Sequence, residues 1–119
     1  MSVQLYDKTQ LDALLSLGGA ELRDQFLADL QRCQQQLRHS IARTADDEKG
    51  GLAQARHGLH EMRGIALTVG ATPLIRLCAE SEAFCDIGRV SEVTARHSEI
   101  LMICSDMVTQ ITADSAGVS

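Results

Sequence analysis

Apolar residues recur three and four positions apart along almost the whole chain, and no stretch alternates apolar and polar residues as a half-buried strand does. This spacing predicts an all-α protein with helices over about 8–17, 20–44, 47–69, 73–87 and 91–113. Four long helices joined by short loops bury their apolar stripes most economically as an antiparallel up-down bundle. The short first segment is expected to be an extra N-terminal helix that lies across one end.

Polar and small residues mark where these helices begin and end. Asp7 is expected to cap the first helix, and the adjacent glycines Gly18 and Gly19 are expected to end it. Thr72 is a good N-cap and Pro73 a good first helical residue, so the short connection before them predicts a tight helical hairpin.

Composition narrows the class of protein. The 119 residues are enough for one domain, which we expect to span residues 1–119, and 45% of them are apolar, enough for a core. Eleven basic and 16 acidic residues leave a net charge of −5 with no basic cluster, so nucleic-acid binding is not expected. No apolar run is long enough to span a membrane, and the first residues do not resemble a secretory signal, so a cytoplasmic location is expected.

The cysteines and most of the histidines have simple structural interpretations. The four cysteines have no CxxC spacing and fall on predicted apolar stripes, which indicates buried thiols instead of disulfides. His97 lies on the stripe of the last helix and is expected to be a boundary histidine with satisfied polar atoms. No metal site is predicted, because His57 and His60 lack further convergent ligands in the sequence.

The helix over 47–69 has an unusual outer face. Its buried stripe is defined by apolar residues three and four apart: Leu52, Ala55, Leu59, Met62, Ala66 and Val69. At about 100° per residue, His60 lies roughly 130° from the centre of this stripe and should face solvent. Gly64 follows one turn later, where a glycine costs about 1 kcal/mol relative to alanine, so close approach by another molecule is the favoured reason for it.

Counting along the hairpin brings a carboxylate to the same level as His60. Eleven residues separate His60 from the turn at Ala71, and eleven more lead to Glu82, so the two stand level in antiparallel helices. Glu82 could accept the Nδ1–H of the imidazole, which would leave the lone pair of Nε2 free as a nucleophile. Arg63 is placed to contact an anionic group that arrives at Nε2.

These residues resemble a known signature. His60-Glu61-Met62-Arg63-Gly64, followed by Gly70-Ala71, Leu74 and Glu82, is similar to the H-x-[apolar]-[KR]-G…G-[apolar]-x-x-L…[EQ] pattern of histidine-containing phosphotransfer (HPt) domains. The resemblance covers the centre of the chain, and the flanking helices agree in length and periodicity. Arg63 stands where members of this family more often carry lysine, and Leu67 where they often carry a small residue.

The resemblance implies a phosphorelay intermediate. His60 would accept a phosphoryl group from a receiver-domain aspartate and pass it to another receiver, Glu82 would orient the imidazole, and Arg63 would contact the phosphate. Gly64 would admit the partner, and Leu67 together with Arg56 and His57 would belong to the docking surface. The implied partners are response-regulator receiver domains and a hybrid sensor histidine kinase.

The chain would need no cofactor of its own, since Mg²⁺ is expected on the receiver, and it lacks nucleotide-binding motifs, so it would be a phosphocarrier and not a kinase. No self-complementary apolar face is evident, so a monomer is expected. Two alternatives remain open: a helical adaptor that binds a receiver or kinase without being phosphorylated, and a metal-binding bundle.

Overall fold

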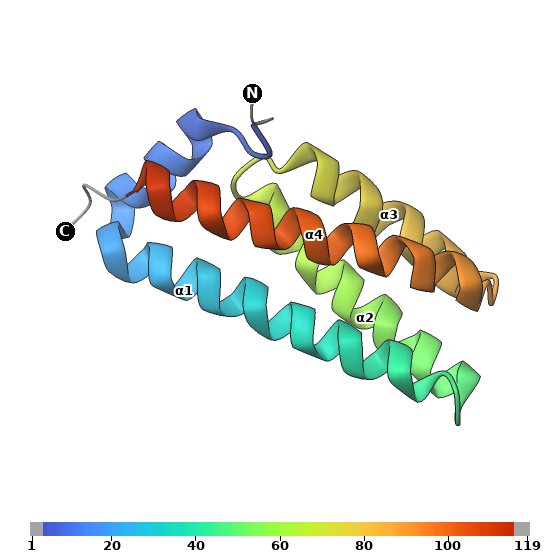
Figure 1. Cartoon of the computed structure of the whole chain (residues 1–119). Helices are drawn as coiled ribbons and strands as arrows, with labels where there is room; N and C mark the ends of the chain where they lie inside the picture. Colours follow the sequence, from blue (N-terminus) through green and yellow to red (C-terminus); the bar gives the residue numbers. More distant parts are fainter. Residues whose placement is uncertain (1–3, 116–119) are drawn as a thin grey trace.

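The computed structural model describes residues 4–115, and this part of the chain consists of four helices and no strands (Figure 1). They are α1 (Lys8–Arg43), α2 (Glu48–Leu67), α3 (Thr72–Asp86) and α4 (Val90–Asp114). The all-helical class expected from the apolar spacing is therefore confirmed. The ends of the helices lie within a few residues of the expected positions.

Helix α1 is interrupted where the adjacent glycines predict the end of the first helix. It extends from Lys8 to Arg43, and two helical parts meet at a kink at Gly19. The backbone of Gly19 is non-helical, with φ 58° and ψ −141°, a region that glycine enters without the steric cost of a Cβ atom. Figure 1 shows the part before the kink set at an angle to the rest of α1.

Caps and turns set the ends of the helices. Asp7 caps α1 by accepting hydrogen bonds from the backbone N–H groups of Thr9 and Gln10, as expected. The expected cap of α3 is wrong: Ala71 occupies the N-cap position without a side-chain bond, and Thr72 is the first helical residue. The carbonyl of Ala71 accepts the first hydrogen bond of α3, from the backbone N–H of Ile75 at 2.9 Å, so the helix starts one residue earlier than expected.

The core is aliphatic and runs the length of the helices. Helix α2 packs against α1 and α3, and α4 packs against α3 and α1. The fully buried large side chains come from all four helices, and they include Leu30, Leu37, Leu59, Met62, Leu74, Ile100, Met107 and Ile111. The four cysteines are buried free thiols, as expected. Among the described residues, no helix is long and apolar enough to cross a membrane.

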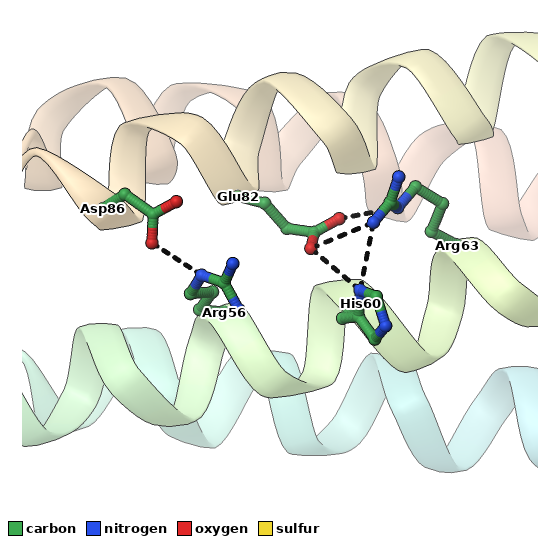
Figure 2. A network of polar contacts seen from close by, with 5 residues as sticks. All are labelled: Arg56, His60, Arg63, Glu82 and Asp86. Atoms are coloured by element: carbon green, nitrogen blue, oxygen red, sulfur yellow. Dashed lines mark hydrogen bonds and ion pairs between the residues drawn. The ribbon is translucent and has the colours of Figure 1, made fainter.

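The α2–α3 hairpin positions the residues of interest. Its turn contains Gly70 at φ +60° and is held by the segment before α1, where the backbone N–H of Asp7 donates to the carbonyl of Val69 at 2.8 Å. Across the hairpin, Arg56 contacts Asp86 and His60 contacts Glu82. A later residue of α3 thus meets an earlier residue of α2, and the polar side chains of both helices meet along one seam (Figure 2).

Candidate functional site

The outer face of α2 carries an exposed histidine opposite a fully buried stripe. Leu59 and Met62 are completely buried, whereas 66% of the side-chain surface of His60 is exposed. The 3.6-residue period of the helix separates these neighbours in the sequence onto opposite sides. Gly64 and Leu67 follow His60 on the exposed side, one and two turns further on.

Glu82 is the one buried acidic side chain in the described core, with 8% of its side chain exposed. It lies on α3 among the inward-facing residues, and its carboxylate points toward α2 (Figure 2). Oε1 lies 3.1 Å from Nδ1 of His60. A buried carboxylate is costly unless it is paired, so its position depends on partners from α2.

Arg63 supplies most of that pairing. Its Nε lies 2.8 Å from Oε2 of Glu82, and its Nη2 lies 3.4 Å from Oε1. The 2.8 Å contact is an ion pair without hydrogen-bond alignment, since Oε2 has no hydrogen-bond partner. The same Nη2 lies 3.0 Å from Nδ1 of His60. The three side chains expected to form the site are therefore in mutual contact (Figure 2).

The Arg63 side chain lies along the seam between α2 and α3. The sequence predicts that it contacts an anionic group arriving at Nε2, and in the structure its guanidinium lies against Glu82 and Nδ1, with a third of the side chain exposed. The buried negative charge on α3 attracts the nearest guanidinium, and Arg63 lies one turn from the level of Glu82. Spacing within α2 alone does not reveal this competition.

Arg56 forms a second link across the hairpin. Its Nε lies 2.6 Å from Oδ1 of Asp86, and both side chains are about half exposed. This pair lies one turn from the pair of His60 and Glu82 on each helix. Sequence reasoning placed Arg56 on the outer face but did not identify Asp86 as its partner. The same level count that pairs residues 60 and 82 would have found it.

On the other side of His60, α1 contributes an arginine that sequence reasoning missed. Nη1 of Arg32 lies 3.2 Å from Oε1 of Glu61, and this hydrogen bond is the main reason that the pKa of Glu61 is lowered. Oε1 of Glu61 also accepts a hydrogen bond from the Sγ of Cys33 at 3.6 Å, while burial raises the pKa of Cys33 to about 12. Glu61 is thus held by α1, and Glu82 is the carboxylate at His60.

His57 lies away from the site that His60 forms with Glu82. It lines an open groove of about 440 Å³ between α1 and α2, together with His39, Gln36 and Gln54. Within residues 4–115, no three His, Cys, Asp or Glu side chains are grouped closely enough to hold a metal ion. The structure thus gives no support to a metal-binding bundle.

The surface beside His60 is open and partly apolar. A Cβ atom built on Gly64 would meet no other atom within 4 Å, so neither packing nor backbone conformation of the isolated chain requires glycine there. Leu67 is 56% exposed. Towards the same end of α2, a groove between α1 and α2 is lined by Leu22, Phe26 and Ile65.

His97 on α4 departs from the expectation of a satisfied boundary histidine. It is partly buried, and its Nε2 has no hydrogen-bond partner. Burial, followed by the nearby positive charge of Arg38 on α1, lowers its pKa. Its charged neighbour Arg38 lies on α1, whereas Glu82 and Arg63, the partners of His60, lie on α3 and α2.

Comparison with known proteins adds the family. No curated protein and no solved structure matches the chain. The family model of the Hpt domain matches residues 21–114, which is most of the chain and includes the whole α2–α3 hairpin. The chain therefore belongs to the Hpt domain family, whose members carry phosphoryl groups on histidine in phosphorelays and interact with receiver domains and kinases.

Proposed function

We propose that His60 is the phosphoryl-accepting histidine of this Hpt domain. It would take the group from a receiver-domain aspartate and pass it to another receiver aspartate. The observation that carries the proposal is the contact of an exposed imidazole with a buried carboxylate, 3.1 Å between Nδ1 and Oε1 of Glu82. His39 and His57 lack this partner and line a groove elsewhere, and His97 is partly buried.

The transfer needs a lone pair on Nε2 and a place for positive charge. The Nε2 lone pair forms the N–P bond while the P–O bond to the aspartate breaks, and its electrons leave with the carboxylate. Nδ1 keeps its proton, so the phosphorylated imidazole is positively charged. Glu82 would orient the ring and stabilise this charge, since a carboxylate acceptor strengthens a hydrogen bond from a charged donor.

Arg63 would contact the phosphoryl group once it has arrived. Its guanidinium lies 3.0 Å from Nδ1 and is one-third exposed, so it is close enough to move toward a group on Nε2. Positioning and charge neutralisation provide most of the catalysis in phosphoryl transfer, and Mg²⁺ is expected on the receiver. This chain would therefore act as a carrier and hold no metal of its own.

The docking surface would consist of Gly64 and Leu67 beside His60, with Arg56 and His57 at its margin. Open space at Gly64 and the exposed Leu67 support this assignment. The partners would be response-regulator receivers and a hybrid sensor kinase, bound by a monomeric, cytoplasmic domain.

We also propose the antiparallel up-down order of the helices, with the segment before Gly19 as an additional N-terminal helix, and a single domain over residues 1–119. The reversed order of the α2–α3 contacts and the kink at Gly19 support the helix arrangement.

The experiment is an intact-mass measurement after treatment with phosphoramidate, a small phosphoryl donor. Wild type is expected to gain one phosphoryl group and to lose it in mild acid, as phosphohistidine does, and His60→Gln is expected to gain none. His57→Gln is the matched control, because this exposed histidine lies one turn away on the same helix. It should be phosphorylated like wild type.

Two results would contradict the proposal. Phosphorylation of His60→Gln would assign the phosphoryl group to another residue. If wild type gains no mass but both wild type and His60→Gln bind a receiver domain equally in a pull-down or by calorimetry, the chain is a non-phosphorylated adaptor.

A further inference from the structure

Nδ1 of His60 faces a donor and an acceptor at the same time. Nη2 of Arg63 lies 3.0 Å from it, and Oε1 of Glu82 lies 3.1 Å from it. A guanidinium only donates hydrogen bonds, and an ionised carboxylate only accepts them. The ring nitrogen holds either a proton or a lone pair, so only one of the two contacts can be a hydrogen bond at any moment.

Arg63 also compensates the charge of Glu82 without help from the imidazole. Its Nε lies 2.8 Å from Oε2 as an ion pair without hydrogen-bond alignment, and its Nη2 donates a hydrogen bond to Oε1 at 3.4 Å. Nη2 carries two hydrogens, and it can direct one to Oε1 and the other to Nδ1. This arrangement requires the lone pair on Nδ1 and therefore the proton on Nε2. With a proton on Nδ1 instead, two N–H groups would face each other at 3.0 Å.

The nitrogen expected to react is the other one. Nε2 lies on the side of the ring away from Glu82 and Arg63 (Figure 2). When the neutral imidazole carries its proton there, Nε2 has no lone pair in the ring plane with which to attack phosphorus. The position of Arg63 therefore acts against the tautomer that phosphoryl transfer needs.

We propose that Arg63 is a positioning residue that holds His60 of the free protein in its unreactive Nε2–H tautomer. The proposal rests on the proposed function and adds a form of regulation to it. An incoming phosphoryl group competes for the guanidinium with several anionic oxygens. Once Arg63 leaves, Nε2 gives its proton to solvent and Nδ1 takes one from solvent, with no net change in charge. Nδ1–H then donates to Glu82, and the free lone pair of Nε2 forms the N–P bond as the P–O bond of the donor breaks.

Holding His60 in the Nε2–H tautomer depends on arginine at position 63. A lysine has a single nitrogen and is a compact point charge, so it cannot face both oxygens of Glu82 in a planar fork while also reaching Nδ1. The observed rate of phosphorylation scales with the fraction of protein whose His60 is in the reactive Nδ1–H tautomer. Arg63 would thus keep the fraction of the reactive Nδ1–H tautomer low until a phosphoryl group draws the guanidinium away from His60.

The test is a two-bond ¹H–¹⁵N spectrum of the histidine rings, recorded on ¹⁵N-labelled protein at a pH where His60 is neutral. We expect wild type to show mainly Nε2–H for His60, and Arg63→Met to show mainly Nδ1–H. Methionine keeps an unbranched side chain but has no donor. Arg56→Met is the matched control, because it removes the ion pair with Asp86 on the same hairpin without touching His60. It should show the wild-type tautomer.

The proposal is overturned if wild-type His60 already carries its proton on Nδ1, or if Arg63→Met leaves the tautomer unchanged. The same samples are then treated with phosphoramidate and weighed. If wild type is not phosphorylated on His60, the proposed function itself fails, and the regulatory role of Arg63 fails with it. If wild type is phosphorylated but the tautomers do not differ, only the role of Arg63 is refuted.

Discussion

Gly64 offers a test that separates folding from partner docking. It lies in the interior of α2, and an added Cβ would meet nothing within 4 Å. Gly64→Ala should therefore stabilise the free protein by about 1 kcal/mol, the difference in helix propensity between the two residues. For a chain of this size, that corresponds to a rise in Tm of roughly 3–5 °C.

The same methyl group should hinder a docked receiver. If the partner approaches the backbone at Gly64 closely, an added methyl overpacks the interface at a cost of about 1–3 kcal/mol. Transfer from a phosphorylated receiver to His60 should then slow by about 5- to 150-fold, because each 1.4 kcal/mol is a factor of ten. Phosphorylation by phosphoramidate should be unchanged, since this donor is small enough to reach Nε2 past a methyl group.

Gly58 provides the matched control. It is also in the interior of α2 with open space at its Cβ position, but it is buried in the groove between α1 and α2, whereas Gly64 is exposed. Gly58→Ala should raise Tm by a similar amount and leave transfer from the receiver unchanged. The assays are thermal unfolding by circular dichroism and a time course of transfer by intact mass.

Two outcomes would refute the reasoning. A more stable Gly64→Ala that accepts phosphoryl from the receiver at the wild-type rate would show that the partner does not approach this position. A Gly64→Ala that is less stable than wild type would show that the glycine is needed by the fold.

Three further predictions concern charge, pH and the hairpin turn. Glu82→Gln should slow phosphorylation by phosphoramidate about tenfold or more, because a hydrogen bond to a charged group contributes about 1.5–3 kcal/mol. Asp86→Asn changes only the neighbouring ion pair with Arg56 and should react at the wild-type rate. Equal rates for both variants would rule out a role of the Glu82 carboxylate. The lowered pKa of His97 means that the unfolded chain takes up a proton before the folded one, so the free energy of unfolding should fall as pH drops below about 6.5. Denaturant titrations between pH 7 and 5 should show a smaller fall in the free energy of unfolding for His97→Gln than for wild type. An identical fall in both proteins would show that His97 is not the cause. Gly70→Ala should destabilise the protein by about 1–3 kcal/mol, because it combines a positive φ with a clash against the side chain of Gln10 on α1. Gly88→Ala has a positive φ but open space at its Cβ, so it should lower the free energy of unfolding by less in the same measurement. An equal loss of stability in both variants would show that the clash at Gly70 is relieved.

Much of the hairpin could be predicted from the sequence, because helical geometry is local and regular. A period of 3.6 residues determines that His60 faces away from Leu59 and Met62, and a rise of about 1.5 Å per residue brings Glu82 to its level. These inferences need only the apolar pattern and the position of the turn. The helical class and the buried cysteines follow from the same pattern.

The tertiary structure determined which residues the polar side chains pair with. Arg63 could reach solvent, a phosphoryl group or Glu82, and the buried carboxylate on α3 attracts it. Arg32 on α1 pairs with Glu61, and the Nε2 of His97 remains without a hydrogen bond between packed helices. Such contacts depend on side chains that are far apart in sequence and compete for the same charge. The sequence by itself determined which residues face each other across the helices, and the packed fold determined which of them bind, because long flexible side chains select partners only after the helices are in place.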